Sequence, residues 1–359
     1  MSTPDRVLMT ADAVGGVWRY AVDLARELAC CDVGTTLAVM GPQPTAAQRA
    51  EARDAQIDVV DRPYRLEWMD EPWDDVAGAG AWLLELEQEV QPSLVHLNGY
   101  AHAALPWSCP VMVVAHSCVR TWWRAVRREA PPPELDRYTC AVTAGLAAAQ
   151  VVVAPTRAMA AALEGEYGAL APACVIPNGR YTTRGVSATP AKEQMVLAAG
   201  RIWDEAKNTG ALCAIADKLA WPVYVAGDPQ RPDGRCGRLS GVHLLGSLSS
   251  EELAGWYDRA SIYALPARYE PFGLSVLEAA SAGCALVLGD IPSLRENWNG
   301  AAVFVPPDDH PALASAIGQL IARPDERARF ARAAADRATA FTIDHTAGEY
   351  LQLYHSLIA

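Results

Sequence analysis

Residues 267–290, ARYEPFGLSVLEAASAGCALVLGD, combine groups that could bind a phosphate. The apolar run SIYALPA predicts a strand, Pro271 interrupts the chain after it, and Gly273 permits a tight entry into a helix that begins near Leu274. The amides of Gly273, Leu274 and Ser275 then lie at a helix N-terminus. Unpaired N–H groups and the helix dipole make such a terminus an anion site.

Two carboxylates flank this anion site. Glu270 lies in the loop at the carboxyl end of the strand, and Glu278 lies about one helical turn further on, roughly 5–6 Å along the helix axis. A carboxylate can bind sugar or ribose hydroxyls by accepting their hydrogen bonds. The spacing alone favours a solvated helix residue and a loop charge, but the Pro-Phe-Gly and Ala-Gly-Cys sequences around it favour a binding site.

A second group of candidates follows the strand-like run MVLAAG. Arg201 and Lys207 come directly after this run, at the strand end where open α/β sheets bind ligands. Two cations there could neutralise a pyrophosphate leaving group as its charge develops. The alternative is an ordinary surface Arg and Lys that pair with Asp204 and Glu205.

Two further candidates lie in the N-terminal half. Gly15 and Gly16 separate the first strand from the first helix, where a glycine pair lets the backbone approach a ligand, although a tight turn explains the pair equally well. The GxGxxG pattern of dinucleotide-binding proteins is absent. Within VMVVAHSCV a buried strand is expected to end in His116, so this residue is either a hydrogen-bonded core residue or a side chain that faces a cleft.

The elements that position these residues alternate regularly. Short apolar runs and amphipathic stretches follow one another from RVLMTA to AVFVPP, which is typical of βα units on a parallel sheet. The fold class we predict is α/β, with two doubly wound Rossmann-like domains facing across a cleft.

The predicted boundaries follow the same pattern. They are 1–178 for an N-terminal domain, 179–194 for a linker rich in Gly, Thr and Ser, 195–340 for a C-terminal domain, and 341–359 for an amphipathic helix that packs back on the N-terminal domain. A helix is also expected over NTGALCAIADKLA.

Composition excludes some functions. The chain has 359 residues and a net charge of −12, so it lacks the basic field that nucleic-acid binding needs, and phosphate must be held by a few local donors. Nine cysteines form no CxxC pair, and no apolar run is long enough for a signal peptide or a membrane span. We therefore expect a cytoplasmic protein with reduced thiols.

Taken together, the motifs resemble a glycosyltransferase of the GT-B fold, most similar to the retaining family 4 (group 1) enzymes. The resemblance rests on the Gly-Gly loop, the histidine after a central strand, VVVAPTRAMAAAL followed by VIPNG, AAGR with Lys207 six residues later, VAGD, HLLGSLSSEELAGWYDRA and EPFGLSVLEAASAG. The chain departs from the family pattern after VIPNG, where it reads RYTTRG.

The resemblance implies roles for the candidate residues in binding a nucleoside-diphosphate sugar. His116, Arg201, Lys207 and Glu270 would be catalytic. The diphosphate would contact Arg201, Lys207 and the amides near Gly273, Leu274 and Ser275. Glu278 would bind the ribose, Leu248 would contact the base, and Glu270 and His116 would bind the donor sugar. Gly15 and Gly16 would approach the donor from the N-terminal domain.

The implied reaction is sugar transfer with retention of anomeric configuration and without a metal or other cofactor. The departing diphosphate would help to deprotonate the acceptor on the same face, so that the protein mainly positions groups and neutralises charge. No DxD motif is present, which agrees with Arg201 and Lys207 replacing a cation. Two alternatives remain: a nucleotide-sugar 2-epimerase or hydrolase on the same fold, and a catalytically silent subunit that binds sugar nucleotides.

The acceptor side is predicted in the N-terminal half. In the segment 118–138, four arginines recur at helical spacing with Trp122 and Trp123 between them. This segment is a solvated helix with core tryptophans, an acceptor-binding lid, or a patch that attracts anionic lipid and so gives peripheral membrane contact. The acceptor is a small molecule, a glycan or a lipid-linked molecule, and its candidate contacts are Asn98, Tyr100, Arg120 and Trp122.

Overall fold

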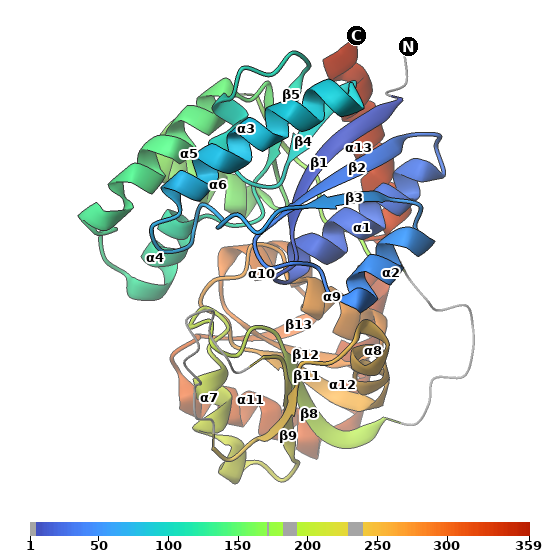
Figure 1. Ribbon diagram of the computed structural model, residues 1–359. Helices are drawn as coiled ribbons and strands as arrows, with labels where there is room; N and C mark the ends of the chain where they lie inside the picture. Colours follow the sequence, from blue (N-terminus) through green and yellow to red (C-terminus); the bar gives the residue numbers. More distant parts are fainter. Residues whose placement is uncertain (1–4, 171, 182–191, 229–239) are drawn as a thin grey trace. The chain divides into compact units, whose positions relative to one another are not determined.

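The computed structural model describes residues 5–170, 172–181, 192–228 and 240–359. The chain divides into two compact units, and each is described by itself (Figure 1). The first holds the described residues up to Arg124, Glu129–Tyr181 and Ile343–Ala359, and the second holds Ala125–Arg128 and the described residues from Lys192 to Thr342. Residues 182–191 of the predicted linker lie outside the described residues.

The first unit is built on a seven-stranded sheet in the order β3-β2-β1-β4-β5-β6-β7, in which every neighbouring pair is parallel. Because the order reverses between β1 and β4, this sheet is doubly wound. The strands are β1 (Arg6–Asp12), β2 (Gly34–Met40), β3 (Asp58–Asp61), β4 (Leu94–Leu97), β5 (Val111–Val114), β6 (Val151–Ala154) and β7 (Ala173–Val175).

Helices cover both faces of this sheet. They are α1 (Gly16–Ala29), α2 (Ala46–Asp54), α3 (Trp73–Val90), α4 (Val119–Arg127), α5 (Asp136–Ala148), α6 (Arg157–Tyr167), α13 (Ile343–Ile358) and the 3₁₀ turns η1 (Ala101–Ala104) and η2 (Pro133–Leu135). Along β1, Val7 and Met9 join the core cluster that contains the buried residues of α1 and α13, while Leu8 between them points to the other face and is equally buried. Burial on both faces explains why the strands read as unbroken apolar runs.

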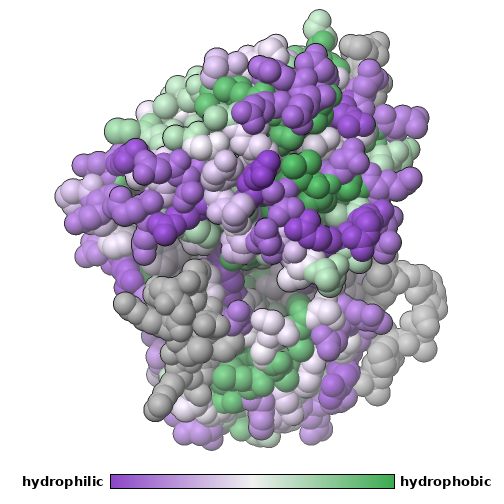
Figure 2. Space-filling view, viewed as in Figure 1, coloured by the Kyte–Doolittle hydropathy of each residue, from purple (hydrophilic) through white to green (hydrophobic). Residues whose placement is uncertain are grey.

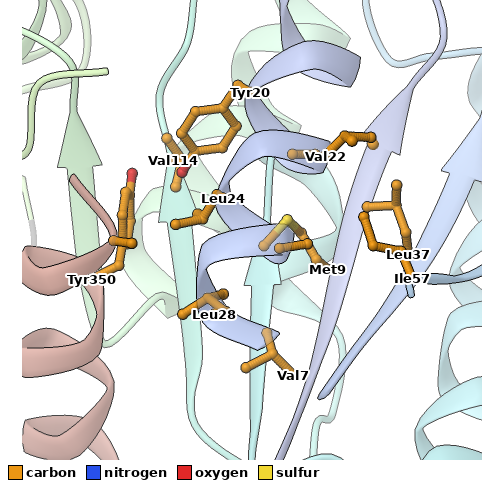
Figure 3. Packing of buried hydrophobic residues seen from close by; sticks show 14 of the residues in the cluster. Val7, Met9, Tyr20, Val22, Leu24, Leu28, Leu37, Ile57, Val114 and Tyr350 are labelled. Carbon is orange, nitrogen blue, oxygen red and sulfur yellow. The ribbon is translucent and has the colours of Figure 1, made fainter. Parts of the chain in front are cut away.

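The C-terminal helix α13 packs against α1 in the first unit. Figure 3 shows Leu24 and Leu28 of α1 directed into the core, with Tyr350 of α13 beside them. The rings of Tyr20 and Tyr350 meet edge to face at 6.1 Å between centroids.

Arg180, the first residue of the segment that departs from the family pattern, is anchored in the first unit. Arg180 forms an ion pair with the buried Asp23 of α1, and its carbonyl accepts the amide hydrogen of Ile343. The Thr346 hydroxyl donates to the Pro177 carbonyl at 2.9 Å. The residues that lead into α13 are therefore fastened beside residues 177–180.

The second unit contains a six-stranded parallel sheet in the order β10-β9-β8-β11-β12-β13. Its strands are β8 (Glu193–Ala199), β9 (Val223–Ala226), β10 (His243–Gly246), β11 (Ala260–Leu265), β12 (Ala285–Gly289) and β13 (Ala302–Val305). Its helices are α7 (Thr209–Cys213), α8 (Ser250–Arg259), α9 (Leu274–Ser281), α10 (Pro292–Trp298), α11 (His310–Ala322), α12 (Pro324–Ala338) and the 3₁₀ turn η3 (Ala216–Lys218).

Two local predictions were wrong. The helix expected over 208–220 is divided into α7 and η3, because Ile215 between them leaves the helical conformation (φ −121°). The strand expected to end in His116 ends at Val114, so His116 belongs to the loop after β5.

The surfaces of the units are mixed. In Figure 2, hydrophobic residues form separate patches among hydrophilic ones. Among the described residues, the exposed large hydrophobic side chains are Trp68, Tyr181 and Leu244, from three separate segments. Over the same residues, none of the helices has the length and apolar character that a membrane span requires.

Candidate functional site

The N-terminus of α9, in the second unit, is the candidate anion cradle. Gly273 precedes the helix with φ 94°, a left-handed conformation, and a Cβ there would lie 3.1 Å from Val276 Cγ2 and 3.3 Å from Leu294 Cδ2. Only glycine therefore fits without strain. Because Gly273 has no side chain with which to cap the helix, the amides of Leu274 and Ser275 are left for a ligand.

Lys207 and Glu270 meet beside this cradle. Lys207 Nζ donates to Glu270 Oε2 at 2.5 Å, and the two side chains are only 17% and 11% exposed. Lys207 follows β8 and Glu270 follows β11, the strand next to it, so both lie at the carboxyl edge of the sheet. The arrangement sets a cation and a hydrogen-bond-accepting carboxylate side by side.

The loop between β8 and α7 fixes the position of Lys207. Asp204 accepts the Ala206 amide at 3.0 Å and pairs with Arg201 at 2.9 Å. The Ala206 carbonyl in turn accepts the Arg268 amide at 2.8 Å, which fastens the loop to the one after β11. The Arg201 side chain is 44% exposed, so its guanidinium, with five N–H donors, can bind an anion while it keeps its bond to Asp204.

Glycines allow the loops after β8 and β9 to touch. A Cβ on Gly227 would lie 1.8 Å from the Gly200 carbonyl oxygen, and Gly227 donates its amide to Gly246 at 2.8 Å. No larger residue could occupy position 227 in this backbone. Leu248, two residues beyond β10, is half-buried against the core that contains α9.

Three residues that the sequence did not single out hold the cradle in place. The Tyr263 hydroxyl on β11 bonds Ser275 Oγ at 2.8 Å and the Ala199 carbonyl at 3.2 Å, so it joins the start of α9 to the end of β8. From α10, Ser293 Oγ donates to the Glu270 carbonyl at 2.5 Å and Asn297 Nδ2 to the Phe272 carbonyl at 3.2 Å. The sequence gives no sign of these contacts, because Tyr263 lies within an apolar strand and Ser293 and Asn297 lie on a short helix.

Glu278 lies in the second turn of α9 and is half-buried. Burial raises the pKa of Tyr257 well above its usual range, and the negative charge of Glu278 raises it further. The carboxylate of Glu278 is thus on the same helix as the amides of Leu274 and Ser275, as the sequence predicts.

In the first unit, the structure brings His116 and Asn98 together. His116 Nε2 lies 2.8 Å from Asn98 Oδ1, and its ring meets the edge of Tyr20 at 4.4 Å between centroids. Burial lowers the pKa of His116 to about 3, so the ring is neutral at physiological pH. Gly15 (φ 147°) and Gly16 are exposed at the N-terminus of α1.

Three of the four predicted acceptor residues have their polar groups engaged within the first unit. Asn98 Nδ2 donates to the Thr10 carbonyl at 2.7 Å. Tyr100 is 2% exposed, with its hydroxyl donating to the Ser117 carbonyl at 2.9 Å. Arg120 donates to Glu166 at 2.9–3.0 Å.

Trp122, the fourth predicted acceptor residue, is half-buried, and its ring lies 6.2 Å from that of Trp123. No group of three or more His, Cys, Asp or Glu side chains gathers as a metal site within the described ranges.

Two family models match most of the chain. The model described as "Glycosyltransferase Family 4" matches residues 14–184, and the model described as "Glycosyl transferases group 1" matches residues 193–323. The two matches contain every residue discussed above as a candidate.

Individual proteins agree with the models. A D-inositol 3-phosphate glycosyltransferase of Xylanimonas cellulosilytica is 27% identical over 285 residues, 70% of this chain and 67% of the relative. Alignments to the curated relatives span from a quarter to two thirds of their lengths.

Solved structures share the fold. A sucrose-phosphate synthase from Thermosynechococcus elongatus superposes with a TM-score of 0.82 at 19% identity, covering 98% of this chain and 99% of that one. Anabaena HepE, solved in complex with UDP-glucose, gives 0.79 at 17% identity, covering 98% and 100%.

Proposed function

We propose that this chain, which belongs to the family 4 (group 1) glycosyltransferases and has their GT-B fold, transfers a sugar from a nucleoside diphosphate to an acceptor with retention of anomeric configuration. The donor is bound mainly by the second unit. The observation that carries the proposal is the Lys207–Glu270 pair beside the uncapped N-terminus of α9.

Each part of the donor has a partner of suitable chemistry. Lys207, Arg201 and the amides of Leu274 and Ser275 bind the diphosphate, because a helix N-terminus and two cations complement its charge. The carboxylates of Glu278 and Glu270 accept hydrogen bonds from ribose and from the donor sugar. Leu248 contacts the base, and Gly15, Gly16 and His116 of the first unit contact the donor sugar and its phosphate.

The reaction requires little covalent chemistry from the protein. As the bond between the sugar and the diphosphate breaks, negative charge grows on the leaving phosphate, and Lys207 and Arg201 stabilise that charge without a metal ion. An oxygen of the leaving phosphate takes the proton of the acceptor hydroxyl. The acceptor oxygen bonds to the anomeric carbon on the face from which the phosphate departs, which retains the configuration. Glu270 orients the sugar and, through its bond to Lys207, the ammonium group.

The first donor to assay is UDP-glucose, because HepE was solved with it. The acceptor is a small molecule, a glycan or a lipid-linked molecule. Release of nucleoside diphosphate without any acceptor would instead favour the epimerase or hydrolase alternative, and binding without turnover would favour a silent subunit.

Lysine occurs at only three positions, 192, 207 and 218, which provides a matched control. Lys207→Ala should lower kcat/KM by about 10²–10³-fold, the usual effect of removing one group that stabilises transition-state charge. Lys218 is exposed on η3, so Lys218→Ala should keep the wild-type rate. The assay follows release of nucleoside diphosphate, reads the anomeric configuration of the product by NMR, and is repeated with EDTA. Equal rates for the two variants would refute the assigned role of Lys207, an inverted product would refute retention, and loss of activity in EDTA would refute metal independence.

A further inference from the structure

Asn98 occupies a constrained position between two neighbouring strands. It directly follows β4, Thr10 lies in β1 on one side, and His116 follows β5 on the other. The Asn98 amide nitrogen of the main chain donates to Thr10 Oγ1 at 2.9 Å, and its side-chain Nδ2 donates to the Thr10 carbonyl at 2.7 Å.

These contacts fix which end of the Asn98 amide faces His116. A carbonyl oxygen can only accept a hydrogen bond, so the group next to the Thr10 carbonyl must be the NH₂ group. The Asn98 oxygen therefore points to His116 Nε2, 2.8 Å away, and this oxygen too can only accept. The proton must then reside on Nε2 of the imidazole.

The rest of the imidazole follows from its charge. Burial favours the neutral ring by lowering the pKa of His116 to about 3. A neutral ring with its proton on Nε2 carries a lone pair on Nδ1. Among the described residues, the titratable groups beside this ring are Tyr20 on α1, whose ring centroid lies 4.4 Å away, and His96 on β4. Burial and the neighbouring His116 lower the pKa of His96 to about 3. Neither supplies a negative charge that would keep His116 protonated.

We propose that Asn98 is a positioning residue that holds His116 in the neutral Nε2–H tautomer, so that Nδ1 is a hydrogen-bond acceptor for a hydroxyl of the donor sugar. The tautomer follows from the contacts above, whereas its use in the reaction rests on the proposed function. Asn98 thus acts through His116. The sequence instead predicts that Asn98 contacts the acceptor. A residue whose amide is held at both ends cannot also turn toward a ligand without breaking one of these bonds.

The tautomer can be read directly in the full-length protein. In the wild type labelled with ¹⁵N-histidine, two-bond ¹H–¹⁵N correlation spectra should show His116 as Nε2–H, with no titration between pH 5 and 8. Asn98→Ala should give a mixture of tautomers and lower kcat/KM about 10-fold, the factor expected for one lost hydrogen bond. A wild-type ring that carries its proton on Nδ1, or that titrates near its ordinary pKa, would overturn the proposal.

Asn98→Asp separates positioning from a merely structural role. A carboxylate against Nε2 should raise the pKa of His116 by about 1–3 units, into the range between pH 4 and 6. Because the charged ring has no lone pair on Nδ1, kcat/KM of this variant should fall on the acid side with the same apparent pKa that the spectra report. A raised pKa in the spectra with a wild-type pH profile would refute the link to turnover.

Thr10→Val is the control for stability. It removes the Oγ1 acceptor of the Asn98 main-chain amide but leaves the Thr10 carbonyl, so the tautomer and the shape of the pH profile should match the wild type even if the melting temperature falls. A shifted profile in this control would mean that any local loosening gives the effect, and would overturn the assignment. If no nucleotide sugar were consumed by the wild type, the proposed function would fail, while the spectra would still decide the tautomer.

Discussion

Tyr263→Phe tests whether one buried hydroxyl joins the two loops of the donor site. Tyr263 is 0% exposed and its hydroxyl bonds Ser275 Oγ at 2.8 Å and the Ala199 carbonyl at 3.2 Å. Two such bonds are worth about 1–3 kcal/mol together, which corresponds to a fall of roughly 2–12 °C in the melting temperature of a unit of this size. Because Ser275 also loses the partner that orients it, the Kd for a nucleoside diphosphate should rise by about 3–10-fold.

The assays are calorimetry for the melting temperature and for the Kd of the nucleoside diphosphate. Tyr224→Phe is the matched control, since the Tyr224 ring on β9 packs against His243 and Trp256 at 4.9 Å and keeps both contacts in phenylalanine. If Tyr263→Phe has the same melting temperature as Tyr224→Phe and binds the nucleoside diphosphate as tightly as the wild type, the Tyr263 hydroxyl does not connect the loops.

Two further predictions concern the first unit. Gly145→Ala on α5 should destabilise the protein by several kcal/mol or prevent folding, because the added Cβ would lie 2.0 Å from the Tyr100 carbonyl oxygen. Gly165→Ala on α6, where a Cβ would meet nothing within 4 Å, should stabilise it by about 0.5–1 kcal/mol. Urea unfolding measures both free energies, and equal effects would contradict the packing. Burial and the neighbouring His116 lower the pKa of His96 to about 3. As pH falls, His96 is therefore protonated in the unfolded chain before it is protonated in the folded protein. The free energy of unfolding should fall by up to about 1.4 kcal/mol for each pH unit between about 6.5 and 3. His96→Gln should reduce that slope, and an unchanged slope would show that His96 does not titrate as described.

The sequence predicts that most candidate residues of the second unit lie close together, because they follow strands of one parallel sheet. Each of Arg201, Lys207 and Glu270 follows an apolar run. Parallel strands have their carboxyl ends at one edge of the sheet, so the sequence alone predicts that these three residues are neighbours. The direct bond between Lys207 and Glu270 could not, because it depends on the path of two loops.

The first unit shows where prediction from sequence stops. The sequence predicts Asn98 as an acceptor contact because it is polar and follows a strand, and it does not show that β1 and β5 lie on either side of β4. That strand order supplies Thr10 and His116 as partners of Asn98. Tyr263 gave no signal for a related reason, since its hydroxyl matters only when the start of α9 folds over β11.

On the proposed function, the second unit binds a nucleoside diphosphate through Lys207 and the start of α9. The most direct test is a thermal-shift measurement on the wild type, Lys207→Ala and Lys218→Ala with a panel of nucleoside diphosphates. At about 100 times its Kd, the bound nucleotide should stabilise the wild type and Lys218→Ala by about 2.7 kcal/mol, and Lys207→Ala by much less at the same concentration. Stabilisation of none of the three proteins by any nucleoside diphosphate, or of all three equally, would contradict the claim.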